Sequence, residues 1–225
     1  MKLHTVFITH NRLHLTKRAI ESYLETVTVP FSFIVVDNNS TDGTIDWLQD
    51  EFPFGCWKRS ADGKQQCYLE LLGENVYPGR ATNSGWLEAP ADATHLHRAD
   101  NDFIFLPGWC DEVERMFQET KLGQLGMRTD EEELFAPSNV GGNNIIRREL
   151  WDKGLRYDER PWPEIRKRNP GCSEDTYFSP AVRKMGYRWD RVTRPCIVNI
   201  DEKDRDDEYY IQSFADRGID IKLWT

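Results

Sequence analysis

The sequence lacks any run of about 20 apolar residues, so no stretch of it predicts a membrane-spanning helix. Its amino terminus has one basic residue before a short apolar stretch, over residues 3–8, which indicates a first β-strand and not a secretion signal. It also lacks a CxxC pair, and its five cysteines are odd in number, which is typical of free thiols in a reducing compartment. These absences predict a cytoplasmic protein.

An excess of positive charge is missing as well. The chain has 29 Lys and Arg residues against 38 Asp and Glu residues, and its net charge is −9. Proteins that bind phosphate backbones non-specifically are usually basic, so broad nucleic-acid binding is disfavoured. The net charge does not exclude a local basic patch that binds an anionic acceptor. With 225 residues and 39% hydrophobic residues, the chain suits a single α/β domain over residues 1–225.

Apolar runs alternate with helical spacing along the first part of the chain. Residues 6–9 and 33–36 are short apolar runs followed by polar turn residues, which is typical of buried strands. Apolar residues recur at helical spacing between them, and residues 44–50 indicate a second helix. This alternation predicts an α/β fold with a mostly parallel central sheet and helices on both faces.

The pattern continues with two interruptions. Further strands are predicted over residues 68–72 and 94–99, and further helices over 83–89, 110–119 and 176–186. Residues 52–66 look like a hairpin insertion, because an Asp-Gly turn lies between Cys56 and Cys67, two residues that are either reduced or paired. Residues 200–225 form a C-terminal extension of uncertain type.

The sharpest chemical signal is Asp100-Asn101-Asp102, at the end of a predicted strand. Carboxylates at i and i+2 of an extended chain point the same way, and the carboxyl ends of strands are where α/β proteins build ligand sites. Oxygen ligands of this kind suit Mg²⁺ or Mn²⁺ bridging protein and diphosphate. The motif alone is weak evidence, since Asp-x-Asp is frequent in so acidic a chain.

Three other motifs each have a structural alternative. Asp37 follows a strand and suits either a nucleotide contact or an Asx-turn. Gly141-Gly142 allows close approach to a ligand, or is simply a loop before a strand. Ser173 resembles a helix N-cap with Glu174 and Asp175 in the first turn, where acids are favourable; Asp175 there is equally a candidate general base.

In their order along the chain, these motifs resemble those of the family 2 glycosyltransferases, which have the GT-A fold. Residues 6–12, VFITHNR, and 34–44, IVVDNNSTDGT, are similar to the first two motifs of that family. Its Glu-Asn…Gly-x-Ala-x-Asn-x-Gly segment is matched by Glu74, Asn75, Gly79, Ala81, Asn83 and Gly85. Asp100-Asn101-Asp102 and Glu174-Asp175 resemble its metal motif and its Glu-Asp motif.

The resemblance implies a role for each matching residue. Donor contacts are implied for Thr9, Asn11, Asp37, Arg80, Asn83, Asp100, Gly142 and Asn143. Within that set, Asp37 would contact the base, most commonly uracil, and Asp100 the ribose or a metal-bound water. Asp102 would bind Mn²⁺ or Mg²⁺ directly, with Asp100 beside it. Asp175 would be the catalytic base, and Glu174 would contact sugar or acceptor.

The sequence departs from the family pattern in two further places. His95, His97 and Arg98 occupy a strand that is often apolar in the family, so we expect a partly exposed or polar-lined strand there and not a zinc site. No histidine after His97 is available to complete the metal site, and Asn199 or Asp201 is the candidate substitute.

The acceptor is not named by the sequence. Trp162 suits stacking on a sugar ring and Arg166 an anionic acceptor, but a solvated loop with a buried tryptophan explains them equally well. A glycan, a lipid carrier, a protein and a modified nucleic-acid base all remain open.

The resemblance implies an inverting, metal-dependent glycosyltransferase that uses a nucleoside-diphosphate sugar, most commonly a UDP sugar. One alternative is a nucleotide-sugar-binding protein without turnover. A sugar nucleotidyltransferase is another, although it usually has a glycine-rich loop after its first strand, where this chain has residues 9–12 without glycine. A dinucleotide dehydrogenase is disfavoured, because no GxGxxG follows a strand.

Overall fold

The computed structural model describes residues 1–52, 67–127, 139–167 and 172–200. Apart from residues 52 and 200 themselves, the expected hairpin insertion and the expected C-terminal extension lie outside these ranges, as do Cys56 and Asp201. Within them, no helix is both long enough and apolar enough to cross a membrane.

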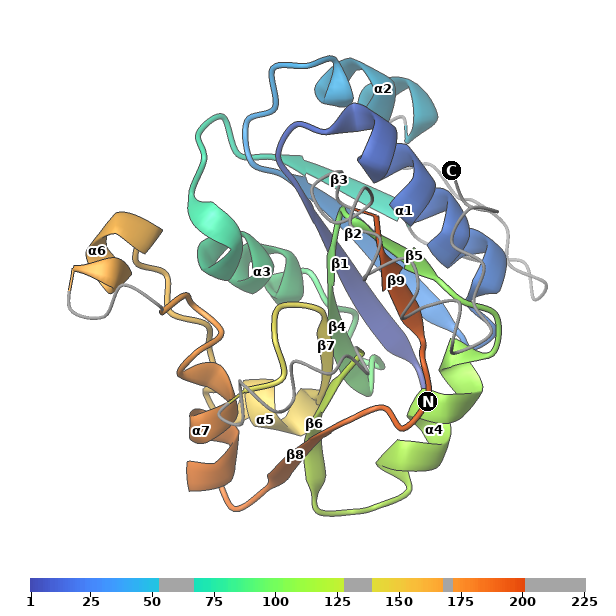
Figure 1. Ribbon diagram of the computed structural model, residues 1–225, viewed down its shortest axis with the longest axis vertical. Helices are drawn as coiled ribbons and strands as arrows, with labels where there is room; N and C mark the ends of the chain where they lie inside the picture. The colour runs from blue at the N-terminus through green and yellow to red at the C-terminus, as the bar shows by residue number, and fades with distance from the viewer. Residues whose placement is uncertain (53–66, 128–138, 168–171, 201–225) are drawn as a thin grey trace, which may run out of the picture.

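A central sheet organises the described residues, with the strand order β3-β2-β1-β4-β7-β6-β8 (Figure 1). Its strands are β1 (Leu3–Thr9), β2 (Phe31–Asp37), β3 (Cys67–Leu71), β4 (His95–Asp100), β6 (Leu122–Gly126), β7 (Asn144–Arg147) and β8 (Arg188–Arg191). The strands β3, β2, β1 and β4 are parallel, and β7 is antiparallel to both β4 and β6. The predicted mostly parallel sheet is therefore confirmed.

A separate antiparallel pair lies beside this sheet. It joins β5 (Phe103–Phe105), directly after Asp102, to β9 (Ile197–Asn199) near the end of the described chain. The main-chain N–H of Ile200 also donates to the main-chain oxygen of Asp102, at 2.8 Å. The pair therefore fixes the backbone on which the Asp-x-Asp motif ends.

Helices cover both faces of the central sheet (Figure 1). They are α1 (Leu13–Thr26), α2 (Thr44–Glu51), α3 (Tyr77–Leu87), α4 (Trp109–Phe117), α5 (Arg148–Asp152), α6 (Trp162–Arg166) and α7 (Phe178–Lys184). Successive side chains of a strand point to opposite faces. Phe7 and Phe33 accordingly pack in a core with α1 and α4, whereas Val6 and Ile34 pack with α3, α5 and α7.

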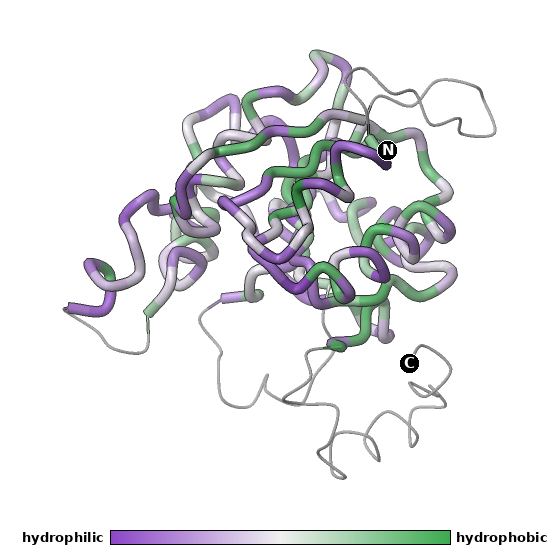
Figure 2. The backbone as a smooth tube through the Cα atoms, turned by 90° about the horizontal axis from the view of Figure 1, so that it is seen from above, coloured by the Kyte–Doolittle hydropathy of each residue, from purple (hydrophilic) through white to green (hydrophobic). Residues whose placement is uncertain are grey.

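The helices show the amphipathic character that this layering requires. Figure 2 shows hydrophobic and hydrophilic stretches alternating along the helical turns, as expected for helices that bury one face. Helix α3 packs tightly on the sheet at Gly85, where a Cβ would lie 2.7 Å from both methyl groups of Val6. This glycine lets Trp86, which is fully buried, fill the core beside it.

Helix α3 begins six residues earlier than its predicted start at Asn83, at Tyr77. Pro78 lies in its first turn, a position where the missing N–H of proline costs nothing. Tyr77 itself has a φ of 66°, which is unusual for a residue with a bulky side chain. Short strands β5, β6, β8 and β9 were not predicted, because none has a long apolar or alternating run.

The expectation that strand 94–99 is partly exposed is wrong. His95, His97 and Arg98 of β4 are all buried, because β4 lies between β1 and β7 and is covered on both faces. The other expectation, of a polar-lined strand, is correct: His97 hydrogen-bonds to Thr5 Oγ1 at 3.2 Å and to Asn143 Oδ1 at 3.1 Å.

Burial of His97 predicts a pH-dependent stability. Burial lowers the pKa of His97 from 6.5 to about 4, although the hydrogen bond to Asn143 partly opposes it. The unfolded chain therefore binds this proton more readily, so the stabilisation is complete above pH 6.5 and is lost as the pH falls towards 4. At pH 5 the loss from this residue is about 2 kcal/mol.

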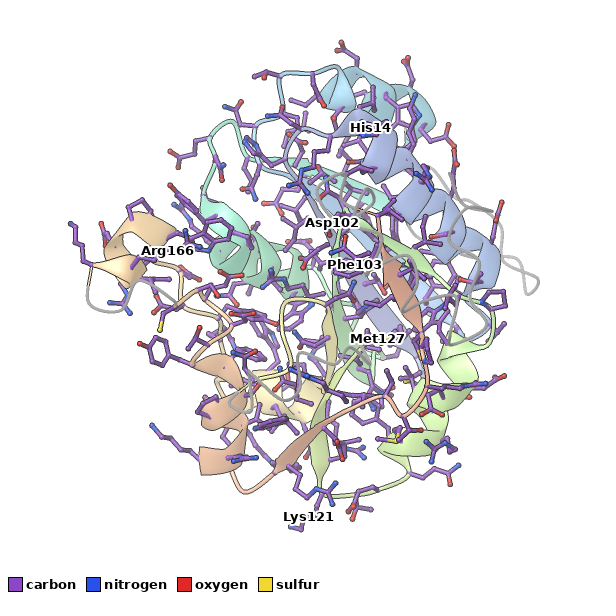
Figure 3. All side chains as sticks on the ribbon, in the orientation of Figure 1. His14, Asp102, Phe103, Lys121, Met127 and Arg166 are labelled. Carbon is purple, nitrogen blue, oxygen red and sulfur yellow. The ribbon has the colours of Figure 1, made fainter. Side chains whose placement is uncertain are left out.

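The measurement is the free energy of unfolding of wild type and His97→Gln at pH 7.5 and pH 5. We expect the pH-dependent loss to be smaller in the variant by about 2 kcal/mol. His14→Gln, at an exposed position on α1 (Figure 3), is the control for replacing a histidine by glutamine. Equal pH dependence in wild type and His97→Gln contradicts the prediction.

Candidate active site

Three parallel strands end side by side at one edge of the sheet. Thr9 at the end of β1 is in register with Asp37 at the end of β2, and Ile8 is in register with Asp100 at the end of β4. The carboxyl ends of parallel strands are the usual position of ligand sites in α/β sheets. The motifs at residues 6–12, 34–44 and 100–102 therefore meet at this edge.

Hydrogen bonds tie the loops after these strands together. Asn11, which has a left-handed φ of 57°, accepts from the Thr41 N–H through Oδ1 at 2.8 Å. Asn101 Nδ2 donates to the main-chain oxygen of Asn11 at 3.2 Å and to Thr16 Oγ1 at 2.9 Å. Asn101 thus holds the Asp-x-Asp segment against the β1 loop.

A pocket of about 380 Å³ opens above these loops. It is lined by Ile8, His10, Arg12, Asn38, Asn75, Tyr77, Pro78, Arg98, Asp100, Asn101, Asp102 and Trp162. Of the predicted site residues, Asp100, Asp102 and Trp162 contribute to this lining.

Both acids of the Asp-x-Asp motif have a cationic neighbour. Asp100 Oδ1 accepts from Arg98 Nε at 3.1 Å, and Asp102 Oδ2 accepts from Arg12 Nη1 at 3.1 Å. Their side chains are about a quarter and a fifth exposed, so both are accessible from the pocket. Figure 3 shows Asp102 near the centre of the molecule, close to Phe103 of β5.

The residues present fit a metal only if a substrate supplies further ligands. Within the described ranges, no three His, Cys, Asp or Glu side chains gather as a metal site. Two carboxylates on one pocket nevertheless suffice for Mg²⁺-type binding when phosphate oxygens and water complete the shell. Asn199 lies opposite Phe103 in the β5–β9 pair, so its backbone is near Asp102, and Asp201 lies outside the described residues.

The Glu174–Asp175 motif lies on a turn and not on a helix, so the predicted capping role of Ser173 is wrong. Helix α7 begins at Phe178, with Tyr177 as its N-cap residue. The Ser173 hydroxyl donates to Asp175 Oδ1, and the Thr176 N–H donates to the Ser173 oxygen at 3.2 Å. The physical reason is tertiary: Glu174 is bonded to Arg98 of β4, which holds residues 174–177 in a turn before the helix.

The two acids of this motif have opposite pKa shifts. Burial raises the pKa of Asp175, and the nearby Glu174 and Asp100 charges act in the same direction. Burial also acts to raise the pKa of Glu174, but attraction to Arg98 and the hydrogen bond from Trp162 outweigh it and lower that pKa. The charged form of Glu174 is therefore stabilised, whereas the surroundings of Asp175 raise its pKa above that of an ordinary aspartate.

Trp162 is neither a loose loop residue nor fully buried. It opens the short helix α6, lines the pocket, and donates from Nε1 to Glu174 Oε2 at 2.6 Å. Its ring lies 5.7 Å from that of Tyr77, and the Arg166 guanidinium lies 4.7 Å from its centroid. Arg166 itself is exposed at the outer end of α6 (Figure 3).

Thr9 and Asp37 lie beneath the pocket and not on its wall. Both are fully buried, and Asp37 accepts from Thr9 Oγ1 at 2.7 Å and from the Ser40 N–H at 2.8 Å. This is the turn-stabilising role that was the structural alternative for Asp37. The next residue, Asn38, faces the pocket instead, and a base contact by Asp37 stays a prediction.

Arg80 and Asn83 are not brought to this pocket. Asn83 is buried and holds the segment before α6, through hydrogen bonds to both main-chain polar groups of Tyr157 at 3.0 and 3.1 Å. Arg80 is more than half exposed and lies 3.7 Å from Glu74. Both residues line a smaller hollow of about 240 Å³ that also contains Arg156.

Gly142 and Asn143 lie behind the acids. A Cβ on Gly142 would lie 2.5 Å from Asp100 Oδ2 and 2.8 Å from Arg98 Nη2, so only glycine fits there without displacing them. Asn143 is buried against His97. Donor contacts by these residues stay predictions.

Arg98, Arg12 and Asn101 are site residues for which the sequence did not predict a role. The available signal for Arg98 was an arginine inside a predicted strand of mixed polarity, two residues before Asp100. Burial would lower the pKa of Arg98, but Asp100 and Glu174 raise it well above its ordinary value, so it stays charged. Arg12 carries no such signal in the sequence, because its contact with Asp102 spans 90 residues.

Comparison with protein families gives one match to the chain. The model described as "Glycosyl transferase family 2" matches residues 5–163, which is well over half of the 225 residues. A search of curated proteins found no match.

Solved structures share the fold at low sequence identity. The mannosyltransferase PcManGT from Pyrobaculum calidifontis, in complex with GDP-Man and Mn²⁺, aligns with a TM-score of 0.64 and 16% identity over 89% of this chain. Residues 1–349 of TarS from S. aureus align with a TM-score of 0.64 and 16% identity over 96% of this chain. The same TarS fragment with UDP-GlcNAc gives 0.63 and 18% over 88%. This chain spans 57%, 65% and 58% of those three chains, respectively.

Proposed function

The chain belongs to glycosyl transferase family 2, and on this premise we propose that it transfers a sugar from a nucleoside-diphosphate sugar to a hydroxyl acceptor. One observation carries the proposal. Arg98 is bonded both to Asp100, which lines the pocket, and to Glu174, the neighbour of Asp175, and this bond supports a shared role for the acids that we propose on the donor and acceptor sides.

The donor is proposed to bind with its diphosphate towards Asp100 and Asp102. These two residues would hold Mn²⁺ or Mg²⁺, which supplies charge neutralisation on the leaving diphosphate when bound. Arg12, 3.1 Å from Asp102, is placed to approach the same phosphates. Support comes from two structural neighbours, one solved in complex with GDP-Man and Mn²⁺ and one with UDP-GlcNAc. A UDP sugar is the first donor to test.

Asp175 is proposed as the general base. It takes the proton of the acceptor hydroxyl while the acceptor oxygen bonds to the anomeric carbon. The bond from that carbon to the diphosphate oxygen breaks in the same step, so the anomeric configuration inverts. The raised pKa of Asp175 suits this role, because a base is most effective when its pKa lies nearer the working pH.

Membership of glycosyl transferase family 2 argues against a nucleotidyltransferase. A measurement of turnover distinguishes the proposed enzyme from a nucleotide-sugar-binding protein without activity. The test is a panel of UDP, GDP and dTDP sugars with Mn²⁺ or Mg²⁺, in which both thermal shift and release of the nucleoside diphosphate are measured. We expect at least one donor to stabilise the protein and to be hydrolysed slowly or transferred. If donors stabilise the protein but no nucleoside diphosphate is released from any of them, the alternative of a binding protein without turnover is favoured.

A further inference from the structure

We infer that Arg98 is a positioning residue that fixes the Glu174–Asp175 turn against Asp100 and thereby sets where the catalytic base stands. This inference rests on the proposed function. It concerns a side chain that takes no part in proton transfer itself and acts through the carboxylates that it holds.

The first support is the geometry of the guanidinium. Arg98 Nε donates to Asp100 Oδ1 at 3.1 Å, and Nη1 donates to Glu174 Oε1 at 2.7 Å. Glu174 is 76 residues further along the chain, on the turn before α7. This guanidinium therefore bridges the Asp100 side and the Glu174 side of the site.

The second support is burial. The side chains of Arg98 and Glu174 are only 4% and 3% exposed, so water screens their attraction weakly. Other groups pack against Arg98 as well: its guanidinium lies 5.2 Å over the ring of Tyr157, and a Cβ on Gly142 would lie only 2.8 Å from Arg98 Nη2. These contacts restrict the positions that the Arg98 side chain can take.

The bridge extends to the wall of the pocket. The second oxygen of Glu174, Oε2, accepts from Trp162 Nε1 at 2.6 Å, and Trp162 lines the pocket. Asp175 follows Glu174 directly in the chain, so the backbone that carries the base is held through its neighbour. A shift of Arg98 is transmitted to the base, to Glu174 and to Trp162 together.

Arginine is the residue type that this position requires. Its planar fork presents several N–H donors in fixed directions, so one side chain can hold two carboxylates at once. Lysine keeps the charge but donates from a single nitrogen on a flexible stem, and it cannot reproduce both bonds in this geometry. An apolar residue would leave Glu174 buried without its cation, which is far more destabilising than the lysine change.

The chain offers a matched control in Arg147 of the neighbouring strand β7. Its guanidinium lies 5.4 Å over the ring of Phe117, much as Arg98 lies over Tyr157. It donates to main-chain oxygens of Leu122 and Phe117, at 2.7 and 2.6 Å, and does not line the pocket. Arg147→Lys therefore perturbs an arginine of similar setting without touching the carboxylates.

The experiment is a double-mutant cycle with Arg98→Lys and Glu174→Gln. The quantity measured is kcat for release of UDP from UDP-N-acetylglucosamine or of GDP from GDP-mannose, whichever donor the wild type turns over. We expect Arg98→Lys to lower kcat about 20-fold in the wild type but less than about 3-fold in Glu174→Gln, because residues in one hydrogen-bond network are strongly coupled. Arg147→Lys should change kcat by the same small factor in both backgrounds.

Gly142→Ala is a second probe that removes no charge and guards against poor folding of Arg98→Lys. Its Cβ displaces the Arg98–Asp100 pair, so we expect kcat to fall in wild type and to fall less in Glu174→Gln. An unchanged kcat in either Arg98→Lys or Gly142→Ala, or equal losses in both backgrounds, overturns the role of Arg98. If the wild-type protein releases a nucleoside diphosphate from none of the donors, the proposed function itself is contradicted.

Discussion

Asp175→Asn is expected to lower kcat by about 10³-fold or more while the donor still binds. Asparagine has nearly the same shape and can still accept the hydrogen bond from the Ser173 hydroxyl, so the turn before α7 is preserved. It cannot take a proton from the acceptor. The loss should therefore appear in kcat, while the dissociation constant for UDP measured by calorimetry changes by less than about 3-fold.

The control for this variant is Asp190→Asn. Asp190 lies on the edge strand β8 and pairs with Arg188 at 3.0 Å, away from the pocket lining. Its replacement should leave both kcat and UDP binding near wild type. Undiminished turnover in Asp175→Asn would remove this residue from the role of base and leave Glu174 as the remaining acid of the motif.

Asp102→Asn is expected to weaken UDP binding in Mn²⁺ by about 100-fold or more, and to abolish the difference between binding with and without Mn²⁺. The physical reason is the loss of a full negative charge from the position proposed to face the metal. Mutating even a residue that only hydrogen-bonds to a metal ligand lowers metal affinity about 10- to 100-fold, so losing a ligand should cost at least as much. The hydrogen bond from Arg12 to the side-chain oxygen can persist in the amide, so the β1 loop keeps its place.

The measurement is calorimetric titration of UDP into wild type and variant, with Mn²⁺ and with EDTA. Asp111→Asn is the control, because Asp111 is an exposed acid in the first turn of α4, shortly after the motif in sequence. It should bind UDP with the wild-type affinity. If Asp102→Asn retains the same Mn²⁺ dependence as wild type, the metal is bound elsewhere or is not required.

The parts of the fold that were predicted from sequence are those with strong local patterns. The apolar runs at residues 6–9 and 33–36 lie within β1 and β2, and the helical spacing from Leu13 corresponds to α1. Each pattern is long relative to the element that it specifies. The Asp-x-Asp motif was also placed correctly at the end of a strand, because the strand predicted over residues 94–99 runs directly into it.

The parts that were missed depend on contacts between distant segments. Ser173 followed by two acids is a good local signal for a helix start, but the buried bond between Glu174 and Arg98 takes precedence and delays α7 to Phe178. Strand β9 is a strand only because β5 pairs with it. Asn83 is bonded to Tyr157, 74 residues away, a contact that no local pattern predicts, and its donor contact stays a prediction.

The same reasoning explains why Arg98 was interpreted as a feature of a polar strand and not as a site residue. In sequence it is one charge in a strand, and its two carboxylate partners become neighbours only when β4 meets the turn before α7. A residue whose role is to join two halves of a site has no local motif of its own.

The measurement that tests the central claim most directly is a crystal structure of the protein with UDP and Mn²⁺, with the manganese located by anomalous scattering. We predict a manganese peak within about 2.5 Å of an Asp102 oxygen and of the UDP phosphates, in the pocket lined by His10, Asn38 and Asp100. UDP in the hollow near Arg80 and Arg156, or in the pocket with Asp102 still bonded to Arg12 and no manganese beside it, would contradict the account.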